Sequence, residues 1–201
     1  MTKNRKDIPF VSILLVGINV VVFFVTLRSE YMLSGKGFLG VYEVFKEGEY
    51  GRLITSMFLH ADLEHLFNNM LILLFLGAML EKEIGHLLLL VVYMLSGLAG
   101  SVFSMGMQMV TNDYYYSLGV SGAVFGLDGL LLAIVVFAGK RFPDITPQRV
   151  LGMLLLSLYS GMRSGGIDNA AHAGGLIGGF LLGMIVCFIL YRKDRINTSE
   201  Y

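Results

Sequence analysis

The chain of 201 residues is poor in charge, cysteine, proline and tryptophan. Only 15% of its residues are charged, whereas soluble domains carry about 25%, and its mean hydropathy is +0.70. The single cysteine, Cys187, excludes a disulfide framework and a thiolate metal site. A net charge of zero supplies no basic face for phosphate groups, so nucleic acid is not expected as a partner. The deficit of charge indicates a membrane protein.

Long apolar runs divide the chain at lengths suited to crossing a bilayer. A membrane helix needs about 20 mostly apolar residues, and six runs come close to this length. They cover residues 8–27, 63–80, 86–107, 119–138, 148–162 and 169–191. The sequence therefore predicts an all-α polytopic membrane protein, a six-transmembrane-helix bundle over residues 8–191 with tails at 1–7 and 192–201.

The distribution of positive charge favours one orientation in the membrane. With both tails inside, ten of the fifteen lysines and arginines lie on the inner side and five on the outer side. The positive-inside rule then predicts a multi-pass protein of the cell membrane with both termini cytoplasmic. The polar connection 28–56 is long for a segment without structure of its own, which indicates a folded, functional loop.

Ser121 lies between glycines at the start of the fourth apolar run, in Gly119-Val120-Ser121-Gly122. A hydroxyl there has the positive end of a helix behind it and no bulky neighbour, which suits a nucleophile. Glycine and serine are also common where membrane helices touch, because they let backbones come close. The motif alone leaves both interpretations open.

Polar residues of three apolar runs should lie at one depth. In the predicted orientation the second, fourth and sixth runs all start at the outer face, which places His65, Asn69, Ser121 and His172 in the outer third of the membrane. Polar groups inside a membrane are costly and mark function. Histidine is the usual base for a serine nucleophile, so we expect His172 to lie opposite Ser121.

His65 and Asn69 are four residues apart and share a helix face. Donors of this kind could stabilise the oxyanion of a tetrahedral intermediate together with the backbone N–H of Ser121. A zinc site is not expected, because the His-Glu-x-x-His pattern is absent and His60 is poorly spaced from His65. We expect His60 to brace the turn before the helix.

Two acidic residues lie near this set in the sequence. Asp168 precedes His172 by four residues, and a helix cap is its expected role, with orientation of His172 as the alternative. Asp128 would lie about 10 Å deeper than Ser121, where we expect it to hydrogen-bond a neighbouring helix. A small transporter with Asp128 as its ion site is a further possibility, but no inverted repeat supports it.

Together these motifs resemble those of the rhomboid intramembrane serine proteases. The shared features are Gly-x-Ser-Gly at 119–122, Ala-His followed by glycines at 171–175, and His-x4-His-x3-Asn at 60–69. The resemblance extends over essentially the whole chain. Arg52 is similar to the arginine of the family's first loop. Two residues depart from the pattern: Gly51 replaces a frequent tryptophan, and Asp128 replaces a usually apolar residue.

The resemblance implies a six-helix bundle with a Ser–His dyad that needs no acid, cofactor or metal. Ser121 would be the nucleophile and His172 the base, and His65, Asn69 and the Ser121 N–H would form the oxyanion hole. Other residues with an implied structural role near the site are His60, Gly119, Gly122, Gly175 and Gly179. The implied substrates are single-span membrane proteins, cut near the outer boundary at small residues in segments that unwind easily.

Hydrolysis also requires water beside lipid. We therefore expect a hydrated cavity above Ser121, capped by residues 161–168 and part of 108–118. Substrate would enter laterally, with the short fifth run (148–162) as the gate. The alternative function is a non-catalytic binder of transmembrane segments with the same fold. The sequence leaves the oligomeric state and the identity of the substrate open.

Overall fold

The computed structural model of the chain describes residues 8–27, 29, 35–138, 145–163 and 168–198. Residues 1–7, which form the predicted N-terminal tail, lie outside the described residues, and so do residues 164–167 of the predicted cap at 161–168. The long helices of the described chain are α1 (Phe10–Thr26), α5 (Leu63–Ile84), α6 (His86–Thr111), α7 (Ser121–Ala138), α8 (Pro147–Arg163) and α9 (Asn169–Thr198).

These six helices correspond one by one to the six apolar runs. α5, α6, α7 and the first 22 residues of α9 are long and apolar enough to cross a membrane, and α1 and α8 are shorter apolar helices. The prediction of an all-α polytopic membrane bundle is confirmed. The sequence placed the end of the second span at Leu80, but α5 continues to Ile84 because Glu81 is buried rather than exposed to water.

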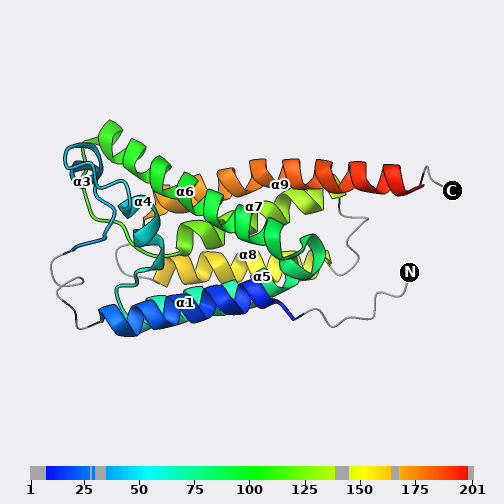
Figure 1. The fold of residues 1–201 in the computed structure, drawn as a ribbon, viewed down its shortest axis with the longest axis horizontal. Coiled ribbons are helices and arrows are strands. Elements are labelled where there is room, and N and C mark those ends of the chain that lie inside the picture. The colour runs from blue at the N-terminus through cyan, green and yellow to red at the C-terminus, as the bar shows by residue number, and fades with distance from the viewer. Residues whose placement is uncertain (1–7, 28, 30–34, 139–144, 164–167, 199–201) are drawn as a thin grey trace.

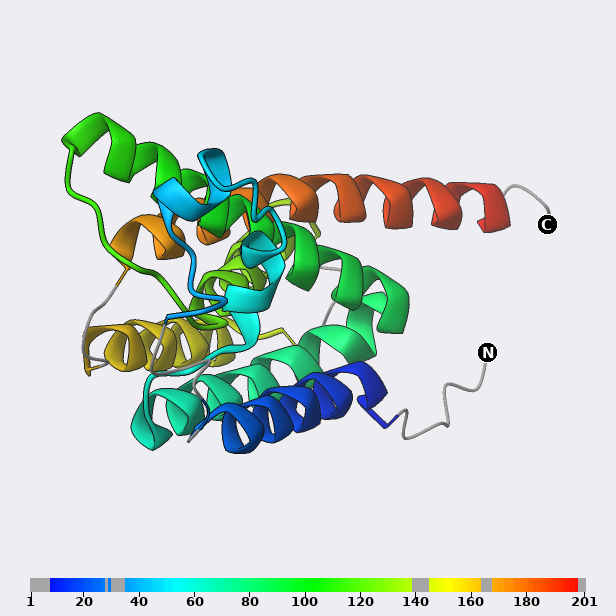
Figure 2. The ribbon, with the colours of Figure 1, turned by 60° about the vertical axis from the view of Figure 1, so that its left-hand side comes forward.

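α7 lies in the middle of the bundle (Figures 1 and 2). It packs against α9 and α6 on one side and against α5 and α8 on the other, while α1 packs on α5 at the edge. Leu127, Leu130 and Leu131 of α7 are fully buried in the core. Ser121 is the first residue of this central helix and therefore lies at one end of the bundle.

The loop between α1 and α5 is folded over residues 35–58, as its length indicated. It contains α3 (Val41–Phe45), α4 (Arg52–Thr55) and the short 3₁₀ helix η1 (Ser56–Phe58). Arg52 holds its start in place by donating to the carbonyls of Gly35 at 3.0 Å and Phe38 at 2.9 Å. A single antiparallel bridge joins the loop to the segment before α7, between Leu39 and Ser117. The loop thus rests on the chain that leads to Ser121.

α7 and α9 meet backbone to backbone through glycines. A Cβ added at Gly175 would clash with the carbonyl of Gly122, and one added at Gly179 would clash with the carbonyl of Gly126. The successive contacts run in the same order along both helices, so α7 and α9 are parallel and start at the same side of the membrane. This approach is the close packing that small residues permit between membrane helices.

The α7–α9 contact gives a stability prediction. Gly179→Ala should lower the free energy of unfolding by about 1–3 kcal/mol, because the new methyl group meets rigid backbone atoms of Gly126. Thermal unfolding in detergent micelles measures the effect. Gly17→Ala in α1 is the matched control, since a Cβ at Gly17 has no neighbour within 4 Å. The same loss in both variants would contradict the contact.

Glu81 lies near the C-terminal end of α5, whereas His65 lies near its N-terminal end, and Glu81 joins α5 to α1 through hydrogen bonds. Its buried carboxylate accepts hydrogen bonds from the backbone N–H groups of Val11 at 2.7 Å and Ser12 at 2.8 Å, and from the Ser12 hydroxyl at 2.6 Å. It also forms an ion pair with His86. The first N–H groups of a helix have no partner within the helix, so Glu81 acts as the N-terminal cap of α1 from another helix.

Glu81→Ala should lower the free energy of unfolding by about 1–3 kcal/mol, because two N–H groups of α1 lose a charged acceptor. Thermal unfolding and the rate of proteolysis within α1 are the measurements. Glu83→Ala, two residues further along α5, is the control because the α1 backbone bonds do not involve Glu83. If Glu83→Ala proves as destabilising, the capping role of Glu81 is wrong.

Candidate active site

The first residue of α7 and the first turn of α9 bring a hydroxyl and an imidazole into contact. The Oγ atom of Ser121 lies 2.8 Å from Nε2 of His172. His172 is only 8% exposed, and Ser121 is half-buried. When the other ring nitrogen carries the proton, Nε2 is free to accept the hydroxyl hydrogen, which is the geometry of an activated serine.

Phe125 fixes the orientation of the imidazole. Its ring stacks on that of His172 with centroids 4.2 Å apart and planes 8° from parallel. Phe125 follows Ser121 by four residues and so shares its helix face. The sequence analysis did not single out Phe125, although this spacing was the signal that could have identified it.

Asp168 caps the helix that carries His172. Its Oδ1 accepts from the N–H of Ala171 at 2.8 Å, and its backbone carbonyl accepts from the N–H of His172 at 3.1 Å. The Ser104 hydroxyl donates to Oδ2 at 2.5 Å and the Tyr115 hydroxyl donates to Oδ1 at 3.2 Å. Asp168 therefore ties the start of α9 to α6 and to the segment before α7. These carboxylate bonds go to groups other than the His172 ring.

The backbone that leads to Ser121 needs a glycine at position 119. Gly119 has φ +117°, a conformation that side chains rarely adopt, and its N–H donates to the Ser56 carbonyl at 2.9 Å. A Cβ there would lie 2.7 Å from Cε1 and 2.9 Å from Nε2 of His65. The imidazole of His65 thus packs against the backbone two residues before Ser121.

Asn69 lies one turn below His65 on α5 and is 4% exposed. Its amide donates to the carbonyl of His65 at 3.1 Å, within its own helix. The N–H of His65 in turn donates to the capping carboxylate of Asp62 at 2.7 Å. The structure therefore places His65 beside the chain that leads to Ser121, and holds the Asn69 amide by a bond to its own helix.

His60 is fully buried and packs edge to face on His65, with ring centroids 5.1 Å apart. Burial and the neighbouring His65 lower the pKa of His60 to about 3, so its ring is neutral at physiological pH. The described residues contain no cluster of three His, Cys, Asp or Glu side chains that could hold a metal ion. Neither ring nitrogen of His60 has a hydrogen-bond partner among the described residues.

Asp128 is 1% exposed, deep in α7. We expected it to hydrogen-bond a neighbouring helix. The Ser157 hydroxyl of the neighbouring helix α8 is its side-chain hydrogen-bonding neighbour, although the two groups lie outside strict hydrogen-bond geometry.

Comparison with known proteins identifies the family. Residues 47–188 match the model described as the Rhomboid domain. RHOMBOID-like protein 4 of Arabidopsis thaliana is 36% identical over 159 residues, which cover 79% of this chain and 39% of the relative. RHOMBOID-like protein 2 of the same plant is 36% identical over 180 residues, 86% of this chain and 54% of the relative.

A bacterial relative carries the name of an enzyme. The rhomboid protease GluP of Bacillus subtilis is 35% identical over 134 residues, which cover 67% of this chain and 25% of GluP. The chain spans about half or less of the length of these three relatives. Because the family model matches more than half of the chain, this multi-pass membrane protein belongs to the rhomboid family.

Proposed function

We propose that this protein is an intramembrane serine endopeptidase that hydrolyses peptide bonds in or near transmembrane segments. The observation that carries the proposal is the 2.8 Å contact between Ser121 Oγ and His172 Nε2 at the end of the bundle axis. Family membership and the similarity to a relative named as a rhomboid protease support it. Single-span membrane proteins are the proposed substrates.

The chemistry starts with attack of the Ser121 oxygen on the scissile carbonyl carbon while Nε2 of His172 takes the hydroxyl proton. The resulting imidazolium then gives this proton to the leaving amine, and a water molecule hydrolyses the acyl-enzyme by the same steps in reverse order. Stacking on Phe125 keeps the imidazole in one plane through both transfers. The dyad thus needs no carboxylate on its second nitrogen.

We assign stabilisation of the oxyanion to hydrogen bonds from the Ser121 N–H, His65 and Asn69. The N–H of the first residue of α7 has no acceptor within its own helix. His65 packs on the adjacent Gly119 backbone, which places an imidazole donor on the same side. Asn69 must exchange its bond to the His65 carbonyl for one to the oxyanion. Such rearrangement on substrate binding is common, because catalytic hydrogen bonds tighten only in the reacting complex.

α8 is the proposed gate for lateral entry. It packs on α7 and α5, and its outward face is apolar, with Leu151 58%, Leu155 56% and Leu158 53% exposed. A helix in contact with lipid along one face and with two helices along the other can swing outward without opening the core. We assign the outer face of the cell membrane to the dyad and the cytoplasm to both termini, on the basis of the positive-inside rule.

Replacement of either dyad residue tests the reaction. Ser121→Ala and His172→Ala should each lower the rate of cleavage at least about a thousandfold, because one removes the nucleophile and the other removes the base that takes its proton. The assay is purified protein with a single-span model substrate in liposomes, and thermal unfolding shows that each variant is folded. Substrate that wild type binds but does not cut would instead indicate the non-catalytic binder.

A reversible crosslink tests the gate. In a Cys187→Ser background, a disulfide between facing turns of α5 and α8 should abolish cleavage of the membrane substrate, because α8 can no longer move away. Reduction with dithiothreitol should restore it in the same sample, which excludes a folding defect. Full activity of the oxidised protein would show that substrate enters elsewhere.

A further inference from the structure

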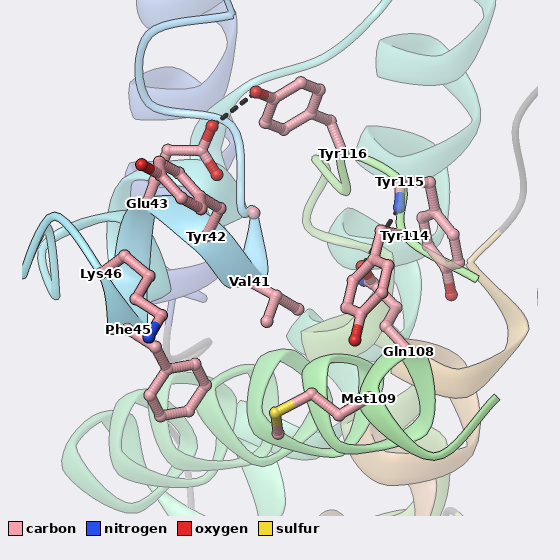
Figure 3. Close-up of a pocket in the computed structure, with 11 residues that line it drawn as sticks. Val41, Tyr42, Glu43, Phe45, Lys46, Gln108, Met109, Tyr114, Tyr115 and Tyr116 are labelled. Carbon is pink, nitrogen blue, oxygen red and sulfur yellow. Dashed lines mark hydrogen bonds between the residues drawn. The ribbon is translucent and has the colours of Figure 1, made fainter. Parts of the chain in front are cut away.

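A cavity of about 630 Å³ lies between α3 and the C-terminal end of α6 (Figure 3). Apolar and aromatic side chains form most of its wall, including Val41 and Phe45 of α3, Met109 of α6, and Tyr114. Its volume lies within the range of small-molecule sites, about 300–1,000 Å³. None of the dyad or oxyanion residues lines it, so the proposed peptidase reaction leaves this cavity without a role.

The cavity lies at the lipid–water boundary on the same side of the membrane as Ser121. α6 has 26 residues, hence a length of about 39 Å, whereas the hydrocarbon core is about 30 Å thick. Its last turn, with Gln108 and Met109, must therefore emerge from the core. Three tyrosines, residues 114–116, follow directly, and tyrosine is typical of this boundary.

The apolar floor of the cavity continues onto a face of α6 exposed to lipid. Val102, Gly106 and Met109 are spaced by four and three residues and so lie on one helix face. Val102 is 53% and Met109 42% exposed. A Cβ at Gly106 would have no neighbour within 4 Å, which leaves open space along the helix. This exposed apolar strip gives an extended hydrocarbon chain a surface to pack on as it enters the cavity from the membrane.

The polar edge of the cavity carries one charge of each sign, Glu43 on α3 and Lys46 directly after α3. Glu43 accepts a hydrogen bond from the Tyr116 hydroxyl (Figure 3). Lys46, one turn further on, has no ion pair within the described part of the chain. A phosphate diester beside Lys46 would gain a charge-assisted bond, and a cationic amine would be attracted to Glu43. A ligand with net negative charge would be repelled by Glu43.

We propose that this cavity binds a phospholipid with a zwitterionic ethanolamine head group. Lys46 holds the phosphate, Glu43 faces the ammonium group, and one acyl chain runs over Met109 and past Gly106. The cavity joins an apolar strip at membrane depth to a pair of opposite charges at the lipid–water boundary. A phospholipid has its acyl chains and its charged head group in the same order, so it matches both the strip and the charges.

Native mass spectrometry of the full chain released from nanodiscs tests the site. The nanodiscs contain equal amounts of phosphatidylethanolamine, phosphatidylglycerol and diacylglycerol, and the protein carries Ser121→Ala so that self-cleavage does not interfere. Phosphatidylethanolamine should be retained preferentially. Lys46→Ala should lower its retained fraction about tenfold, the usual loss for one charged hydrogen bond. Lys36→Ala is the matched control, since Lys36 lies in the same loop but does not line the cavity.

Retention of phosphatidylethanolamine that is equal in Lys46→Ala and Lys36→Ala would overturn the proposal, as would preferred retention of phosphatidylglycerol or diacylglycerol. A second variant, Met109→Asp, should weaken binding through the acyl chain, and thermal unfolding confirms that it is folded. The readout is lipid bound to a protein without its nucleophile. A failure here therefore leaves the proposed peptidase activity untouched, and the reverse also holds.

Discussion

Contact between the backbones of α7 and α9 is the constraint on which the rest of the structure depends. Ser121 and His172 lie on different helices, 51 residues apart in the chain, and a hydrogen bond between short side chains requires the helices to approach closely. Glycines at 122, 126, 175 and 179 bring the two backbones into direct contact at two successive turns. Dispersion contacts between backbones then hold the helices together in a membrane, where the hydrophobic effect between helices is absent.

Much of the architecture follows from periodicity and length. Six apolar runs predict the six long helices because the bilayer fixes the length of a span. The glycine spacing on α7 and α9 predicts that these two helices face one another closely. The contact between Ser121 and His172 agrees with this prediction. Orientation in the membrane and the oxyanion roles of His65 and Asn69 stay predictions.

Other features depend on contacts that a pattern does not reveal. Glu81 appeared to close the second span as a water-exposed charge, yet it lies buried against the start of α1. The sequence alone does not distinguish a carboxylate that faces water from one that faces another helix. Tyr115 and Ser104 meet Asp168 from distant segments, and Asp128 faces Ser157 of α8, a pairing that the sequence pattern does not identify. Only the folded arrangement decides these cases.

The parallel glycine seam between α7 and α9, formed by Gly122, Gly126, Gly175 and Gly179, also gives the two halves of the bundle different mechanical roles. Sliding or rotating either helix would drive a glycine carbonyl into the opposite backbone, so the two behave as a single rigid body. α8 shares no part of that seam and meets the rest of the bundle through ordinary side chains. Under the proposed function, α8 can therefore move to admit a substrate while the spacing of Ser121 and His172 stays fixed in the other half of the molecule.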